Sequence, residues 1–223
     1  MRANIWRTVE LQAKWGLQNH VPGDITDISI LEEYVYETKP ESALEKQFRR
    51  QGYSVLVYTQ FLYPVPVPPD KAARFRPAYH PKNVFYGAIE IETSFYETAY
   101  YFMKERILFK KPTSSAEPKT VFEVGFKDSK AQMIHGLPNI AAIMDRNDYS
   151  ASHAYTKATV CNSIYYPSAR RAEGNCIAAY EIEVLDKEPS KQMGVRFTFD
   201  GKKQACKVDT DSGEIWIEWK VVS

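Results

Sequence analysis

The stretch from residue 84 to residue 103 constrains the fold most, because it predicts a strand that leads directly into a helix. Residues 84–92 have the composition and alternation of a strand, which places Tyr86 on the face opposite Phe85 and Ile89. An apolar stripe at helical spacing follows, made of Phe95, Ala99, Phe102 and Met103. A strand joined in this way to a helix with one apolar face predicts a mixed α/β fold.

The last third of the chain predicts mostly antiparallel β structure. Strand-like segments occupy residues 163–166, 175–184, 195–199, 205–208 and 214–222. Turn signals separate the last three, at Asp200-Gly201 and Asp211-Ser212-Gly213. With 44% apolar and 26% charged residues among 223, the composition suits a globular protein with one substantial core. We therefore expect a mixed α+β fold in one domain spanning residues 1–223, with an antiparallel, β-rich C-terminal third.

Six further segments have recognisable patterns. Strands are predicted at 7–11, within 53–63, at 120–126 and at 131–134, and helices from Asp27 to the residue before Pro40 and from Asp148 to about Thr159. Residues 64–69 read Pro-Val-Pro-Val-Pro-Pro, which cannot continue a strand ladder and favours an extended polyproline conformation. We interpret them as a stiff connector that leads to Arg74; a ligand for an aromatic groove is the alternative.

Charge and cysteine content exclude several classes of protein. Twenty-nine basic and 28 acidic residues leave a net charge of +1, which is too small for nonspecific binding to nucleic acid. Cys161, Cys176 and Cys206 are odd in number and lack the spacing of a zinc site or a disulfide scaffold, which favours the cytoplasm. There is no apolar stretch typical of a secretory signal or long enough to cross a membrane, so export and membrane insertion are not expected.

The region from Arg74 to Glu97 combines groups that suit a charged, sugar-bearing ligand. A basic turn contains Arg74 and Arg76, the predicted strand carries Tyr86, and Glu97 lies near the start of the predicted helix. Arginine matches phosphate oxygens, tyrosine offers a ring face and a hydroxyl, and a carboxylate stabilises positive charge that develops on a sugar. We expect these side chains to surround one cleft, because strand and helix ends place side chains reproducibly.

Each of these residues also has a purely structural interpretation. The segment Ser94-Phe95-Tyr96-Glu97 matches a capping box, in which Glu97 only closes the start of a helix. Arg74 and Arg76 fit a solvated surface pair equally well. Tyr86 is one of 15 tyrosines, and most tyrosines pack in a core.

Four short motifs in order resemble the RES domain, a family named for its arginine, glutamate and serine. They are Arg74-Phe75-Arg76, Phe85-Tyr86-Gly87-Ala88, Glu92-Thr93-x-x-x-Glu97 and Tyr166-Pro167-Ser168-Ala169-Arg170. The resemblance covers roughly residues 5–185, because the segments Ile5 to Glu10 and Asp148 to Ser152 also match. His153 stands where similar sequences are expected to have glutamine, so the resemblance implies no role for its helix.

The resemblance implies an activity, a fold and a partner. RES domains are known as toxins of bacterial toxin–antitoxin pairs that consume NAD, by phosphorolysis or hydrolysis of the nicotinamide bond, and some members are described as ADP-ribosyltransferases. Their fold resembles that of the ADP-ribosyltransferase toxins. NAD is then a consumed substrate and no cofactor is expected, while the implied protein partner is an Xre-type antitoxin. Whether the chain forms a homo-oligomer stays open.

The resemblance also implies which residues form the site. It assigns catalytic roles to Arg74, Tyr86, Glu97 and Ser168, with Arg74 a better match to the family arginine than Arg76. We expect Ser168 to donate a hydrogen bond to ribose or to the carboxamide, because Pro-Ser-Ala-Arg lacks the nucleophile elbow of serine hydrolases. Arg76 and Arg170 are expected to bind substrate phosphates, although Arg170 also fits a charged turn. Two rival functions stay open, namely ADP-ribosyl transfer to a protein and ligand binding without turnover.

Other polar residues show no recognisable site. His20, His80, His135 and His153 lack metal-binding spacing, so no metal is expected. Neither Gly-x-Gly-x-x-Gly nor a Walker loop is present, so dinucleotide binding in the Rossmann manner is not supported. We interpret Arg7 and Glu10 as a solvated or structural pair.

Overall fold

One continuous sheet of nine strands organises the computed structural model, which describes residues 1–10, 42–63, 65–108 and 114–223. The strands lie in the order β4-β5-β6-β2-β1-β3-β7-β8-β9. Every neighbouring pair is antiparallel except β4 and β5, which are parallel. Their bounds are β1 Arg2–Glu10, β2 Phe85–Ala88, β3 Ser114–Lys127, β4 Gln132–Met133, β5 Ser163–Pro167, β6 Asn175–Ala179, β7 Lys191–Asp200, β8 Ala205–Thr210 and β9 Gly213–Glu218.

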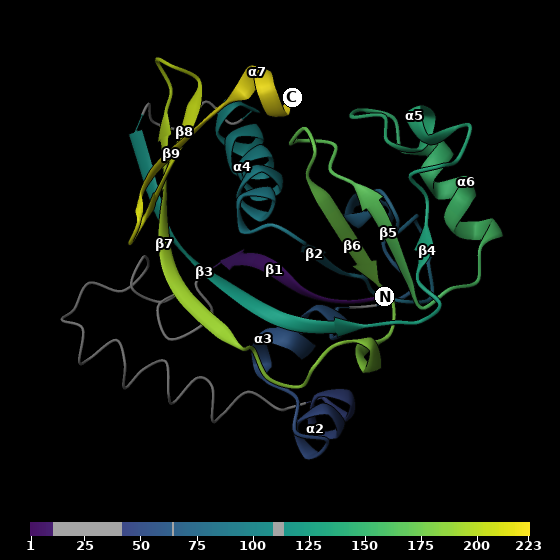
Figure 1. The fold of residues 1–223 in the computed structure, drawn as a ribbon. Coiled ribbons are helices and arrows are strands. Elements are labelled where there is room, and N and C mark those ends of the chain that lie inside the picture. Colours follow the sequence, from purple (N-terminus) through teal and green to yellow (C-terminus); the bar gives the residue numbers. More distant parts are fainter. Residues whose placement is uncertain (11–41, 64, 109–113) are drawn as a thin grey trace.

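Helices cover both faces of this sheet (Figure 1). Their bounds are α2 Ala43–Arg50, α3 Val55–Tyr58, α4 Ile91–Leu108, α5 Ile140–Ile143, α6 Ser150–Ala158 and α7 Trp219–Val222, with short 3-10 turns at Thr59–Phe61, Pro69–Lys71 and Ile182–Val184. The mixed α/β class and the strand-rich C-terminal third predicted from the sequence are therefore confirmed. Among the described residues, no helix is both long enough and apolar enough to span a bilayer.

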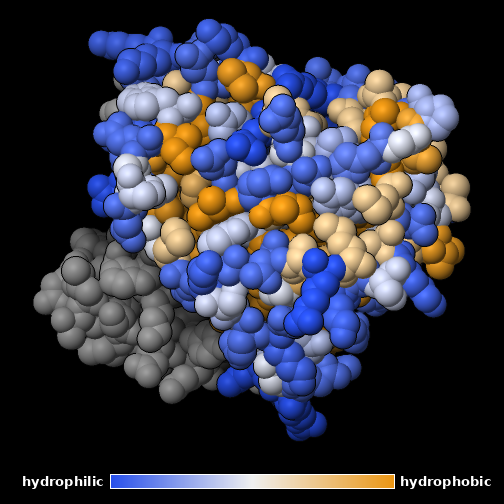
Figure 2. Space-filling view, in the orientation of Figure 1, coloured by the Kyte–Doolittle hydropathy of each residue, from blue (hydrophilic) through white to orange (hydrophobic). Residues whose placement is uncertain are grey.

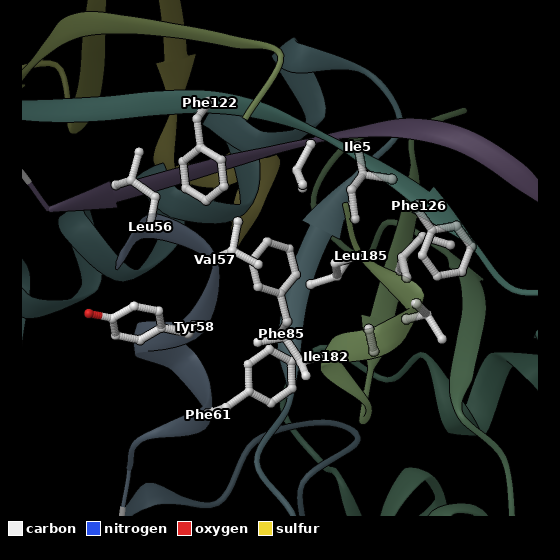
Figure 3. Close-up of a cluster of buried hydrophobic side chains, with 14 of the residues drawn as sticks. Ile5, Leu56, Val57, Tyr58, Phe61, Phe85, Phe122, Phe126, Ile182 and Leu185 are labelled. Atoms are coloured by element: carbon white, nitrogen blue, oxygen red, sulfur yellow. The ribbon is translucent and has the colours of Figure 1, made fainter. Parts of the chain in front are cut away.

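One face of the sheet packs against α2 and α3. Ile5, Phe85 and Phe122 on neighbouring strands contact Val57 and Phe61, and all five are at most 8% exposed (Figure 3). Phe85 reaches this face because alternate strand residues point to opposite sides, which sends Tyr86 to the other face as predicted.

Two separate helical groups cover the opposite face. The helix α4 packs over β3, β7 and β8 through Phe95, Phe102 and Met103, which confirms the predicted apolar stripe. Farther along the sheet, α5 and α6 pack over β5 and β6, where Ile143 and Ile164 are fully buried. The middle strands β1 and β2 lie between the strands that these two groups cover (Figure 1).

Three predicted strands are wrong in whole or in part. Residues 53–63 form α3 and a 3-10 turn, because Val57 and Phe61 lie one helical turn apart and pack together against the sheet. Tertiary burial thus overrides the strand propensity of this segment. The strand predicted over 175–184 stops at Ala179 and is followed by a 3-10 turn, and the one over 214–222 stops at Glu218, where α7 begins.

The other boundaries differ less. The first strand starts at Arg2, the predicted strand at 131–134 shrinks to Gln132–Met133, and the strand at 84–92 is limited to Phe85–Ala88 because α4 begins at Ile91. Residues 120–126 lie within the longer β3. The helix predicted from Asp27 to Pro40 lies outside the described residues, as does Pro64 of the connector.

Candidate functional site

A cleft of about 410 Å³ opens over the middle strands, between α4 and the segments that carry Arg74 and Tyr149. Arg7, Arg74, Tyr86, Glu97 and Arg170 line it, together with Trp6, Thr8, Tyr101, Lys119, Tyr149, Tyr166 and Cys176. In the space-filling view, apolar residues gather in the middle of this side of the molecule and hydrophilic residues border them (Figure 2). The cleft therefore combines cations, one carboxylate and several aromatic rings.

Glu97 is held at one end of the cleft by a hydroxyl and a thiol. The Ser168 hydroxyl donates to Glu97 Oε1 at 2.6 Å, and Cys176 Sγ lies 3.9 Å from the same oxygen. The Ser168 oxygen in turn accepts the backbone N–H groups of Arg170 and Arg171, both at 3.0 Å. Because these two donors occupy the serine lone pairs, the serine proton is directed to the carboxylate. Ser168 and Glu97 thus act as one unit although 71 residues separate them.

The capping-box interpretation of Glu97 is wrong. The helix α4 begins at Ile91, so Ser94 and Glu97 both lie inside it. The Ser94 hydroxyl accordingly donates back to the Ile91 carbonyl at 2.7 Å, as an interior helix serine does. Glu97 makes its hydrogen bonds across the cleft rather than to its own helix start.

Cys176 and Tyr166 form the buried floor beside Glu97. Burial raises the pKa of the Cys176 thiol well above its ordinary value, with the nearby Glu97 charge adding to the effect. Burial and the neighbouring Cys176 likewise raise the pKa of Tyr166. Both groups therefore stay protonated and neutral at physiological pH, so Glu97 is the anionic group of this end of the cleft.

Arg74 and Arg76 have different environments, which distinguishes the two candidate arginines. Arg74 lines the cleft, is 8% exposed, and donates to the Ile143 and Asp145 carbonyls at 2.9 and 2.7 Å, with its guanidinium 4.8 Å from the Tyr149 ring centre. Arg76 donates to the Lys71 carbonyl at 2.8 Å and is not among the residues that line the cleft. Its buried Nε nevertheless has no hydrogen-bond partner in the described part of the chain.

Tyr86 presents its ring to the cleft, and its hydroxyl oxygen is buried. No hydrogen bond of good geometry reaches this oxygen from the described residues, although the Phe75 backbone lies near it. Burial raises the pKa of Tyr86 to about 12, although the nearby Arg76 acts in the opposite direction. A buried neutral hydroxyl without a protein partner is costly and suits a ligand or a water molecule that completes its hydrogen bonds.

Arg7 lines the same part of the cleft, which the sequence analysis missed. One guanidinium nitrogen donates to the Tyr86 carbonyl, and the guanidinium lies 4.8 Å from the Phe85 ring centre. Its Nε is buried and lacks a partner within the described residues, and burial lowers the pKa of Arg7 to about 10. The sequence led us to interpret Arg7 as solvated or structural; the structure shows that it is desolvated and lines the cleft.

Arg170 lies at the edge of the cleft, where protein carbonyls occupy its donors. It is 2% exposed and donates to the Val222 carbonyl at 2.6 Å and to the Arg146 carbonyl at 3.2 Å. Its guanidinium also lies 3.4 Å from the Tyr100 ring centre. Four of the six predicted site residues thus line the cleft, Ser168 is joined to it through Glu97, and Arg76 is set back from it.

His153 supports the arginine turn. Its Nε2 lies 2.9 Å from the Ala73 carbonyl, and a ring nitrogen facing a carbonyl must carry the proton. The helix α6 is therefore tied to the residue that precedes Arg74, which gives His153 a structural role. Across residues 1–10, 42–63, 65–108 and 114–223, no group of three histidine, cysteine or acidic side chains is placed to hold a metal ion.

Comparison with known protein families gives a match over most of the chain. The family model of the RES domain matches residues 44–200, which is more than half of the sequence. The matched region contains Arg74, Tyr86, Glu97 and Ser168, whereas Arg7 and α7 lie outside it. No curated protein matches the chain.

Proposed function

The chain belongs to the RES domain family, and from this premise we propose that it cleaves the nicotinamide–ribose bond of NAD in the cleft around Glu97. The family is known generally for NAD-related toxin domains. The observation that carries the proposal is that one cleft combines a fixed carboxylate with two buried donors, Arg7 Nε and the Tyr86 hydroxyl, that have no partner among the described residues.

The carboxylate suits the bond that breaks. Cleavage of the N-glycosidic bond moves its electron pair onto the nicotinamide nitrogen and builds positive charge on the ribose anomeric carbon. An anion held in place before the reaction stabilises that charge without a cost of reorganisation. The hydrogen bond from Ser168 fixes the Glu97 carboxylate in this way.

The remaining residues of the cleft suit the phosphates and the nicotinamide. Arg7 Nε and the Tyr86 hydroxyl are buried donors without partners in the described chain, and burial of a polar group without a hydrogen bond costs about 1–3 kcal/mol. Phosphate oxygens would complete these hydrogen bonds and neutralise the Arg7 charge. Arg74 adds a second cation on the cleft wall, and the Tyr86 ring offers a face for the nicotinamide.

The acceptor decides the product. Attack of water on the anomeric carbon yields ADP-ribose, nicotinamide and one proton, whereas attack of inorganic phosphate yields the phosphate ester of ADP-ribose and nicotinamide. Transfer to a protein side chain begins with the same loss of nicotinamide. We propose phosphate or water as the acceptor, and the ADP-ribosyltransferase-like fold expected for the family accommodates either.

Purified protein incubated with NAD, with and without inorganic phosphate, tests the proposal. We expect release of nicotinamide together with an equal amount of ADP-ribose, or of its phosphate ester when phosphate is present. Release that occurs only when a second protein is added, with the ADP-ribosyl group attached to that protein, would instead identify a transferase. Unchanged NAD at high protein concentration would reject catalysis and leave a binding function.

A NAD-consuming protein in the cytoplasm depletes its own cell, so we propose that an Xre-type antitoxin restrains it by covering the cleft. Expression of the chain alone should lower cellular NAD and stop growth, and coexpression of the neighbouring small reading frame should restore both. Normal growth during high expression of an enzyme that consumes NAD in vitro would contradict the toxin role but not the chemistry.

A further inference from the structure

The helix α7 makes direct contact with the turn that carries Ser168. Arg170, two residues after Ser168, places its guanidinium under the Val222 carbonyl at 2.6 Å and against the Tyr100 ring. The last carbonyl groups of a helix have no hydrogen-bond partner within the helix. The Arg170 guanidinium therefore supplies a hydrogen bond that the Val222 carbonyl would otherwise lack. Arg170 is 2% exposed, and Val222 is fully buried.

The same helix is fixed on two further sides. Trp219 stacks on Tyr100 of α4, with ring centres 5.5 Å apart and planes only 5° from parallel. Arg146 donates to the Ser223 carbonyl at 2.7 Å, and Arg170 donates back to the Arg146 carbonyl at 3.2 Å. Figure 1 shows α7 next to α4 at the top of the molecule. We call Tyr100, Arg146, Arg170, Trp219 and Val222 the α7 bracket.

The α7 bracket connects the elements that carry the site. Tyr100 lies three residues after Glu97 on α4, and Arg170 lies in the turn that presents Ser168 to Glu97. Arg146 follows Asp145, whose carbonyl accepts a hydrogen bond from Arg74. A shift of this turn relative to α4 would therefore change the 2.6 Å contact between Ser168 and Glu97 directly.

We propose that Arg170 is a positioning residue, and that α7 holds the Ser168 turn against Glu97 through it. This inference rests on the proposed function for its catalytic consequence. The residue was expected to bind a substrate phosphate, but its two terminal nitrogens are occupied by carbonyls and its guanidinium plane by a ring. The family match ends at residue 200, so α7 lies outside the matched region.

Arg170→Lys and Trp219→Ala test this role, with Arg196→Lys as the matched control. Lysine keeps the positive charge of Arg170. Its single nitrogen lacks the planar fork with which the guanidinium donates to the Val222 and Arg146 carbonyls at the same time. Trp219→Ala releases α7 without changing any residue that lines the cleft. Arg196 is an exposed arginine on β7 that does not line the cleft, so Arg196→Lys makes the same exchange away from the site.

Two measurements distinguish positioning from substrate binding. We expect Arg170→Lys to lower kcat for nicotinamide release by about tenfold or more with KM changed by less than about twofold, because a small misplacement of reacting groups costs rate rather than binding. Amide hydrogen exchange of residues 168–171 should become faster, and Trp219→Ala should change both values in the same direction. Arg196→Lys should leave both values at those of the unmodified protein.

Other results would overturn the role. A raised KM with unchanged kcat in Arg170→Lys would make Arg170 a substrate contact. Unchanged exchange of residues 168–171 in folded Arg170→Lys and Trp219→Ala proteins would separate α7 from the turn. If the unmodified protein releases no nicotinamide, the proposed function fails on its own, and the exchange measurement still decides whether α7 holds the turn.

Discussion

The two ends of the cleft differ in how their polar groups are satisfied. At the Glu97 end, the carboxylate, the Ser168 hydroxyl and the neighbouring backbone N–H groups form a closed set of hydrogen bonds. At the other end, Arg7 Nε and the Tyr86 hydroxyl are buried without partners in the described chain. Glu97 lies on α4 and Ser168 follows β5, whereas Arg7 and Tyr86 lie on the neighbouring strands β1 and β2, so different elements supply the two ends.

This difference shows which end is complete before a ligand binds. The hydrogen bonds around Glu97 keep its charge in one position, which is what electrostatic catalysis requires. Buried groups without partners cost stability, and native proteins contain few of them. We infer that the Arg7 end accepts that cost because the ligand supplies the missing partners, so substitutions there should weaken binding without weakening the fold.

The largest effect is expected for Glu97→Gln. The amide oxygen can still accept the Ser168 proton, but the negative charge is lost. We expect kcat for nicotinamide release to fall by about a hundredfold, which corresponds to a loss of roughly 3 kcal/mol of transition-state stabilisation. The affinity for NAD should change by only a few-fold, and the free energy of unfolding by at most about 1 kcal/mol.

Glu105→Gln is the matched control for this experiment. Glu105 is an exposed carboxylate on the same helix that does not line the cleft, so the loss of its charge should leave kcat unchanged. A folded Glu97→Gln protein with the kcat of the unmodified protein would remove the basis of the proposed mechanism and make the Glu97 end of the cleft a structural feature.

The second largest effect is expected for Arg7→Met, with opposite consequences for binding and for stability. Hydrogen bonds to charged groups contribute about 1.5–3 kcal/mol, so NAD should bind roughly tenfold to a hundredfold more weakly. The free energy of unfolding should change little, because the lost bond to the Tyr86 carbonyl is offset by relief of a buried charge. Titration calorimetry and chemical denaturation measure the two quantities.

Arg2→Met controls for the loss of a positive charge on the same strand. Arg2 is exposed and lines a different groove of the molecule, so neither quantity should change. If Arg7→Met destabilises the fold by several kcal/mol while NAD affinity is retained, the Arg7 end is a structural site and the inferred difference between the two ends is wrong.

The sequence predicted the parts of the cleft that depend on local patterns, and it missed the parts that depend on contacts between distant residues. The strand and helix over residues 84–103 have strong local periodicity, which predicts both elements. The four family motifs assigned Arg74, Tyr86, Glu97 and Ser168 to one site. Whether Glu97 closed a helix start depended on where α4 begins. That boundary is fixed at Ile91 by the position of the preceding strand, which local spacing does not reveal.

Arg7 was missed because its partner is far away in the sequence. Arg7 donates to the Tyr86 carbonyl, 79 residues later in the sequence, and no local sequence pattern predicts such a contact for a single arginine. A period of two places Arg7 on the side of Ile5, the face that packs against α2 and α3, so the strand pattern did not predict that Arg7 lines the cleft. The same limit explains the error over 53–63, where contacts with distant strands decided the conformation.

A third effect is expected at alkaline pH. The pKa of Tyr86 is raised to about 12 in the folded protein from an ordinary value of 10, so the unfolded chain loses this proton first. Stability contributed by the neutral hydroxyl is therefore present below pH 10 and is lost as the pH rises above it. We expect Tyr86→Phe to become more stable relative to the unmodified protein by about 1 kcal/mol between pH 9 and pH 11. Denaturation at both pH values measures this difference, and Tyr79→Phe, at a tyrosine that is 71% exposed, should show none.

The smallest effect is expected at neutral pH, where Tyr86→Phe and Tyr180→Phe should differ in sign. The Tyr180 hydroxyl donates to the Phe75 carbonyl at 2.9 Å, so its removal should lower the free energy of unfolding by about 1 kcal/mol. The Tyr86 hydroxyl has no such partner in the described chain, so its removal should leave stability unchanged or slightly higher. NAD affinity should respond in the reverse way, with a loss of about threefold to tenfold in Tyr86→Phe, which corresponds to one neutral hydrogen bond, and none in Tyr180→Phe. Equal destabilisation of the two variants, with NAD affinity unchanged in both, would show that the Tyr86 hydroxyl has a hydrogen-bond partner within the protein. A ligand would then not be needed to complete the hydrogen bonds at the Arg7 end of the cleft.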